Sequence, residues 1–194
     1  MKTIKSASLI LTVLVFFSVP NAIAQQTNVG NEENNPIETQ ERGINFITKS
    51  AYEAISYNGY TISEINATEG NEQAVLQQLW GTPTSVKEQG ASSRLFKYGN
   101  NRVMFNTDFK YATNIIIKDN QWTLTVQGQA IRVGDTFSSL QQKFTEDLKI
   151  RYVPMIGPEY LVFFDHAENA YDGVGIYFNP ETHRIQEIRY FVNP

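Results

Sequence analysis

The sequence predicts an α+β domain whose antiparallel sheet is built from two tandem helix-plus-β-meander repeats, with both helices on one face. Three observations lead to this prediction: internal similarity at constant offsets, an amphipathic helical stripe in each half, and two-residue alternation after each helix. We place a single domain at residues 44–194, with repeats at about residues 55–120 and 121–194. A content of 41% hydrophobic and 19% charged residues fits one globular domain.

The first 24 residues have the three-part pattern of a secretory signal peptide. Lys2 and Lys5 precede an apolar run over residues 9–17, and Ala22 and Ala24 fit a cleavage site after Ala24. The apolar run is about half of the ~20 residues that a membrane-spanning helix needs. Residues 25–43 lack large apolar groups and are predicted to be a flexible leader. We therefore expect a secreted or periplasmic protein with no integral membrane segment after cleavage.

Composition excludes several classes of function. The formal net charge is −4, and removal of Lys2 and Lys5 with the signal peptide would make it −6. A nucleic-acid partner is not expected, because phosphates are neutralised by clustered cations. The sequence contains no cysteine, which excludes disulfides, thiolate metal sites and a cysteine nucleophile.

Two parts of the sequence are similar at constant offsets. An offset of 64 relates positions 70, 71, 76–78 and 80 to positions 134, 135, 140–142 and 144, and it also places residues 60 and 62 on residues 124 and 126. An offset of 73 relates positions 103, 105, 106, 115 and 117 to positions 176, 178, 179, 188 and 190. The change of offset predicts one nine-residue insertion in the second copy, within residues 165–173.

Each copy is predicted to begin with a helix and to continue as a meander. Asn71 and Asp135 are the predicted N-caps, because a short side-chain oxygen can accept from an unpaired first-turn amide. Apolar stripes follow at positions 75, 76 and 79 and at positions 137, 140 and 144. Two-residue alternation then predicts strands at residues 101–105, 114–118, 173–178 and 185–190.

Alternation divides the strand residues between two faces of the sheet. The face expected to meet the helices consists of Val103, Phe105, Ile115, Ile117, Val174, Ile176, Phe178 and Ile188. The other face, which we call the open face, is expected to present Arg102, Met104, Lys118, Tyr177, Glu187 and Arg189. Arginine and aromatic side chains are typical interface anchors. The candidate partner-binding residues are therefore Arg102, Met104, Tyr177, Glu187 and Arg189, with Asp165 and His166 from the loop at residues 165–173. The alternative is that these are ordinary solvated strand positions.

Residues suited to catalysis form no recognisable motif in this sequence. His166 and His183 are the two histidines, and no Gly-x-Ser-x-Gly elbow is present. Ser138 and Ser139 lie at a predicted helix start, where serine is common for backbone reasons. Paired carboxylates of the glycosidase kind stay an alternative, because the sequence singles out no pair.

One short segment collects potential metal ligands. Asp165, His166, Glu168 and Asp172 lie close together in the sequence, but their spacing matches neither a His-Glu-x-x-His motif nor an EF-hand loop. Nucleotide-binding glycine motifs are also missing. We expect no metal, no cofactor and no enzymatic activity.

Short phrases beside the two predicted helices resemble those of a known module. LWGTP at residues 79–83 follows the first helix, and IRVGDT at residues 131–136 leads into the second. They resemble the repeated module of β-lactamase-inhibitory-protein-like domains and of small envelope-assembly lipoproteins of the SmpA/OmlA type. The resemblance covers about residues 55–192 and implies the shape and a protein-binding surface. This chain lacks the disulfides of the inhibitors and has Gln25 where the lipoproteins have a lipidated cysteine, so no functional residue is carried over.

These features together predict a secreted, non-enzymatic binding protein of the bacterial cell envelope. Its open face and residues 165–173 are expected to hold a protein or peptide partner. The alternative is a small secreted hydrolase or ligand-binding domain with a concave pocket of the nuclear-transport-factor-2 type, which would lack the duplication. A structural protein whose only role is envelope assembly is the third interpretation.

Overall fold

The computed structural model describes residues 44–67, 70–144, 148–153, 159–166 and 172–192, all within one compact unit, residues 35–194. The predicted signal peptide and leader lie outside the described residues. The described chain is α+β and consists mostly of strands. Its elements in order are β1 (Ile44–Phe46), α2 (Lys49–Glu53), β2 (Ser56–Tyr57), β3 (Tyr60–Thr61), α3 (Ile62–Asn66), α4 (Glu72–Trp80), β4 (Ser85–Glu88), β5 (Ser93–Tyr98), β6 (Asn101–Asn106), β7 (Tyr111–Ile117), β8 (Leu124–Val126), β9 (Gln129–Ile131), α5 (Phe137–Lys143), β10 (Arg151–Val153), β11 (Glu159–Asp165), β12 (Asp172–Phe178) and β13 (Ile185–Val192).

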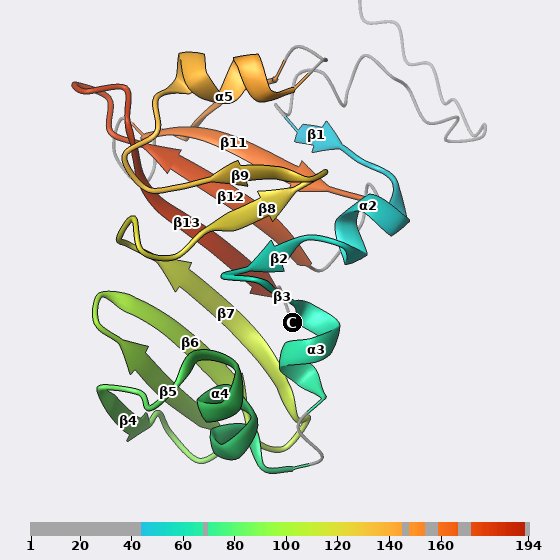
Figure 1. Cartoon of the computed structure of the whole chain (residues 1–194), viewed down its shortest axis with the longest axis vertical. Helices are drawn as coiled ribbons and strands as arrows, with labels where there is room; N and C mark the ends of the chain where they lie inside the picture. Colours follow the sequence, from blue (N-terminus) through green and yellow to red (C-terminus); the bar gives the residue numbers. More distant parts are fainter. Residues whose placement is uncertain (1–43, 68–69, 145–147, 154–158, 167–171, 193–194) are drawn as a thin grey trace, which may run out of the picture. The chain divides into compact units, whose positions relative to one another are not determined.

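The described strands form two sheets rather than the single sheet that the sequence predicted (Figure 1). The large sheet has nine strands in the order β1-β11-β12-β13-β7-β6-β5-β4, with β10 also paired to β11. The small sheet has the order β3-β2-β8-β9. The described pairs are antiparallel except β1 with β11, which run parallel with Ile44 opposite Phe163. The sheet is therefore mixed, because residues 44–46, which precede both predicted repeats, add a strand to it.

The centre of the large sheet is the antiparallel pair β7 and β13. Ile116 lies opposite Arg189, and on either side Ile115 pairs with Tyr190 and Ile117 with Ile188. This pair joins the meander β4 to β7 to the meander β10 to β13. The offset of 73 relates Ile116 to its own partner, Arg189, so the two meanders meet with matching registers.

The strand pairing of the hairpin β6–β7 is repeated in the hairpin β12–β13, 73 residues later. Val103 pairs with Ile115 as Ile176 pairs with Ile188, and the register shifts after Met104 in one hairpin and after Tyr177 in the other. A β-bulge at the same place bends both hairpins in the same way.

The turns of these two hairpins also agree. The Asn106 Oδ1 atom accepts hydrogen bonds from the amides of the second and third residues after it, and Asn179 Oδ1 does the same. Each turn then has one residue with positive φ, Lys110 at 58° and His183 at 52°. Asparagine is suited to this position because its short side-chain oxygen can accept hydrogen bonds from two backbone amides of the turn.

The two principal helices are capped differently. Asn71 caps α4 by accepting from the amide of Ala74, as predicted. The predicted cap Asp135 is wrong, because Thr136 caps α5 by accepting from the amide of Ser139. The Asp135 carboxylate instead accepts from the Arg132 amide and from Lys143 Nζ, at 3.1 and 2.8 Å. The helix therefore begins one residue later than expected.

The two hairpins of the small sheet relate residues of the two halves differently from the offset of 64 that the sequence predicted. Its hairpins turn at Asn58-Gly59 and at Gln127-Gly128, all four with positive φ, as a two-residue type I′ turn requires. These turns are related by an offset of 69. Ile55 and Tyr57, rather than residues 60 and 62, therefore correspond to Leu124 and Val126, and all four are buried.

The offset between the two meanders changes in two steps rather than the predicted one. Phe96 of β5 and Val162 of β11, which pair with Val103 and Ile176, are related by an offset of 66. Since β4 and β10 are related by an offset of 64, the second meander is longer by two residues between β10 and β11 and by seven between β11 and β12. The second place lies within the predicted range, although residues 167–171 are outside the described residues.

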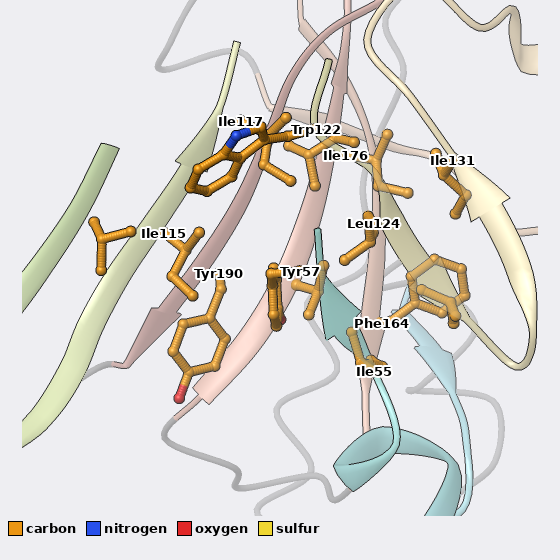
Figure 2. Close-up of a cluster of buried hydrophobic side chains, with 14 of the residues drawn as sticks. Ile55, Tyr57, Ile115, Ile117, Trp122, Leu124, Ile131, Phe164, Ile176 and Tyr190 are labelled. Atoms are coloured by element: carbon orange, nitrogen blue, oxygen red, sulfur yellow. The ribbon is translucent and has the colours of Figure 1, made fainter. Parts of the chain in front are cut away.

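One hydrophobic core unites the elements. All eight residues predicted to face inward are buried, with at most 2% of each exposed. Leu76 of α4 and Leu140 of α5 are fully buried in the same cluster. Figure 2 shows Ile115, Ile117, Ile176 and Tyr190 of the large sheet together with Ile55, Tyr57 and Leu124. The core therefore lies between the inward face of the large sheet and the small sheet.

We predict that Thr136→Ala lowers the free energy of unfolding by about 0.5–2 kcal/mol, because α5 loses the acceptor for its first-turn amide. Urea unfolding of purified protein measures this change. Thr136→Ser, which keeps the oxygen, serves as the control and should stay close to wild type. An unchanged Thr136→Ala variant would show that another residue caps α5.

Candidate functional site

The open face is defined by the outward residues of the large sheet. Strand register aligns Lys97, Arg102, Ile116 and Arg189 in one row. Leu95, Met104, Asn114 and Phe191 form the neighbouring row. Arg102 is exposed and Met104, Ile116 and Phe191 are partly exposed. The structure therefore brings the predicted Arg102, Met104 and Arg189 together on one accessible surface.

Glu187 and Tyr177 lie on this face but are buried, which corrects their expected exposure. The Glu187 carboxylate accepts from Lys118 Nζ at 2.8 Å and from Arg189 Nε at 2.9 Å, with a second contact from the Arg189 guanidinium. Arg189 Cζ also lies 5.2 Å from the centroid of the Tyr177 ring, a cation–π arrangement. Glu187 and Tyr177 are thus covered by the cations that they hold, and only 8% and 9% of them is exposed.

A glycine makes room for an aromatic pair on the same face. Phe163 and Phe191 stack with their ring centroids 5.7 Å apart. A Cβ atom on Gly173 would lie 2.2 Å from Phe163 Cζ, so the ring of Phe163 occupies the space above this glycine. The absence of a side chain at Gly173 therefore determines where the aromatic pair lies.

The open face is basic although the chain is acidic. Among the described residues its cations are Lys87, Lys97, Arg102, Lys118 and Arg189, whereas the whole chain carries −4. Lys118 and Arg189 share the single carboxylate of Glu187, which offsets one of their two charges. Lys97 and Arg102 lie directly opposite each other, and neither has a carboxylate partner within the described residues. Opposed like charges destabilise a strand pair, so folding gives no reason for this arrangement.

Asp165 and His166, the two remaining predicted residues, lie elsewhere, at the end of β11. The His166 ring stacks on Tyr52 of α2 with centroids 4.5 Å apart. Asp165 is 5% exposed, and its Oδ1 atom accepts from the His166 amide at 2.6 Å. The predicted site residues are therefore divided between the open face and a second region.

This second region is a pocket of about 610 Å³, which we call the tyrosine pocket. Its lining consists of Tyr52, Glu53, Tyr57, Ile62, Ser63, His166 and Asp172. Tyr52 donates its hydroxyl proton to Asp172 Oδ2 at 3.0 Å. Tyr52, Tyr57 and Ser63 were not predicted as site residues, and no local signal marks them, because α2 lies more than a hundred residues before Asp172.

Burial controls the ionisation of the tyrosines around this pocket. Burial, together with the nearby Asp172 carboxylate, raises the pKa of Tyr52, Tyr57 and Tyr190 well above the ordinary tyrosine value. Burial alone raises the pKa of Tyr98 to about 12. Tyr52 is therefore protonated at neutral pH and acts as a hydrogen-bond donor to Asp172, not as a base or nucleophile.

A smaller pocket of about 460 Å³ is lined in part by a serine and by the second histidine. Ser138, Ile150 and His183 are among its lining residues. In the described part of the chain no hydrogen bond joins Ser138 to His183. The pairing of nucleophile and base that activates a serine is therefore not formed there.

Potential metal ligands do not converge within the described residues. No three histidine or acidic side chains in this part of the chain lie close enough to hold one ion. Glu168, a member of the sequence cluster, lies outside the described residues.

Comparisons with known proteins are sparse. No protein-family model and no curated protein matches the chain. One similar crystal structure is an extracellular protein containing an SCP domain from Bacillus anthracis, with a TM-score of 0.38, 13% identity, and coverage of 88% of this chain and 50% of that one. Another is a cysteine-rich secretory protein from Staphylococcus aureus, with a TM-score of 0.35, 11% identity, and coverage of 63% and 44%. The chain thus spans half or less of each structure, and TM-scores below 0.5 assign neither fold nor function.

We predict that Gly173→Ala lowers the free energy of unfolding by about 1–3 kcal/mol, because the new methyl group displaces the Phe163 ring. Urea unfolding measures the loss. Combining it with Phe163→Leu should restore most of the stability that Gly173→Ala removes, and strictly additive effects of the two substitutions would contradict the contact.

We predict that the free energy of unfolding falls as the pH rises above about 10. The folded state keeps the protons of Tyr52, Tyr57, Tyr98 and Tyr190, whereas the unfolded chain releases them near that pH. Phenolate absorbance and circular dichroism, recorded together, should show these protons leaving only as the protein unfolds. Tyr98→Phe should shift this transition to higher pH. Titration of all ten tyrosines in the folded protein would contradict the prediction.

Proposed function

We propose that this chain is a secreted, non-enzymatic binding protein whose open face holds an acidic segment of a protein partner. The opposed cations Lys97 and Arg102 carry this proposal. They lie without carboxylate partners beside the partly exposed Met104 and Ile116. A partner's carboxylates would neutralise the two cations, while its apolar side chains would cover the neighbouring row.

Secretion and the envelope location rest on the sequence. Residues 1–24 have the pattern of a cleavable signal peptide. Within the described residues no helix is long and apolar enough to cross a membrane. The resemblance to β-lactamase-inhibitory-protein-like and SmpA/OmlA-type modules favours a place in the bacterial cell envelope and a protein as partner.

An internal duplication accounts for the open face in this proposal. It is supported by the common register, bulge position and asparagine turn of the hairpins β6–β7 and β12–β13. Positive φ at Gly70 and Gly134, before the two helices, adds to this support. The two copies, joined at Ile116 and Arg189, would present one continuous outward surface.

The alternative of a secreted hydrolase has less support. Ser138 and His183 share a pocket without a hydrogen bond between them in the described part of the chain, and Tyr52 keeps its proton and donates a hydrogen bond to Asp172. We therefore assign recognition rather than chemistry to this chain.

A fluorescent peptide of alternating glutamate and leucine tests the proposal, with its lysine counterpart as the probe of opposite charge. Fluorescence anisotropy with the purified secreted chain should show binding of the acidic peptide only. The double variant Lys97→Ala/Arg102→Ala should bind at least fivefold more weakly, and added salt should weaken wild-type binding because the attraction is electrostatic.

The matched control is Lys49→Ala/Arg132→Ala, which removes one lysine and one arginine from exposed positions away from the open face. This variant should bind like wild type. Equal losses in the two double variants, or no binding of the acidic peptide to the wild-type chain, would overturn the proposal.

A further inference from the structure

The tyrosine pocket is a second site, made from parts of the chain that do not contribute to the open-face rows. Tyr52 and Glu53 come from α2, Tyr57 from β2, and Ser63 from α3. Opposite them lie His166, after β11, and the first residue of β12. Its volume of about 610 Å³ is in the range of small-molecule sites.

The charge of the lining is negative. Asp172 and Glu53 are its carboxylates, and no lysine or arginine belongs to its described lining. Glu53 is exposed and already paired with Lys49 at 2.6 Å. Asp172 accepts one hydrogen bond, from the neutral Tyr52 hydroxyl, and has no cationic partner within the described residues. Of the two carboxylates in the lining, Asp172 is therefore the one that no described cation neutralises.

Aromatic rings surround this carboxylate. Tyr52 and His166 stack with an interplanar angle of 27°, and Tyr57 packs edge-on against Tyr190 at 5.7 Å. The pocket thus combines an unpaired carboxylate with several π faces. Ring faces attract cations because their quadrupole is negative above the plane, and quaternary ammonium groups are recognised in this way.

The lining also contains a buried polar atom, on His166. His166 Nδ1 is buried without a hydrogen-bond partner in the described part of the chain, 3.7 Å from Asp165 Oδ1. The Asp172 carboxylate in the lining disfavours an anionic ligand and favours a positively charged one.

We propose that the tyrosine pocket binds an alkylammonium group, which pairs with the Asp172 carboxylate and lies against the rings of Tyr52, Tyr57 and His166. A bare metal ion is a weaker candidate, because no set of three histidine or acidic ligands converges among the described residues. The group can belong to a free amine or to a lysine side chain, since both present the same cationic head.

Isothermal titration of the full secreted chain tests this proposal. Choline should bind saturably, whereas 3,3-dimethylbutanol, its uncharged isostere, should bind at least tenfold more weakly. Nα-acetyllysine methylamide, titrated separately, distinguishes the two sources of the ammonium group: tighter binding than choline indicates a lysine side chain of a protein, and weaker binding indicates a free amine. Equal binding of choline and its isostere, or no binding of either cation, would overturn the proposal.

Variants locate the site. Asp172→Asn should reduce choline affinity at least tenfold, whereas Asp108→Asn, the same change on an exposed turn, should leave it unchanged. Tyr52→Phe, which keeps the ring and releases the Asp172 oxygen, should bind choline at least as well as wild type. If Asp172→Asn fails to fold, Tyr52→Lys, which places a competing cation beside Asp172, should abolish binding, and retained binding would place the site elsewhere.

The test is independent of the open face. Lys97→Ala/Arg102→Ala should leave choline binding unchanged, so failure of one proposal does not imply failure of the other.

Discussion

The pairing of β7 with β13 is the interaction on which the rest of the structure depends. It joins two four-stranded meanders at Ile116 and Arg189 and aligns Ile115 with Tyr190 and Ile117 with Ile188. Side chains alternate between faces, so a slip of one residue here would turn these inward side chains outward. The two meanders would then no longer present a common apolar surface to Tyr57 and Leu124 of the small sheet.

The same register creates the open face. Because Arg102 and Arg189 both lie opposite Ile116, their cations flank an apolar side chain in one row. Glu187 pairs with both Arg189 and Lys118, but Lys97 and Arg102 stay opposed without a carboxylate among the described residues. Departures from local stability rules of this kind are expected at functional sites. The proposed recognition of an acidic partner would account for this pair.

The tyrosine pocket lies outside the part of the large sheet where the hairpins β6–β7 and β12–β13 have matching registers. It depends on α2 packing near the start of β12, where Tyr52 reaches Asp172. The seven additional residues between β11 and β12 distinguish the second meander from the first at this place. The two proposed sites thus lie on different parts of the structure, one on the outward face of the large sheet and the other among α2, β2, α3 and the start of β12.

Period-two alternation and the offset of 73 were sufficient to predict the inward set, the hairpins β6–β7 and β12–β13, and the outward placement of Arg102, Met104 and Arg189. These features depend on short-range patterns that strand geometry imposes on neighbouring residues. Tertiary packing alone decided the parallel strand β1, the second sheet, the cap at Thr136, the burial of Glu187 beneath two cations, and the tyrosine pocket. Most of these features bring together residues that lie far apart in the chain. The cap at Thr136 instead depends on a choice between two neighbouring residues, Asp135 and Thr136, whose energies as caps are similar. No local pattern distinguishes them.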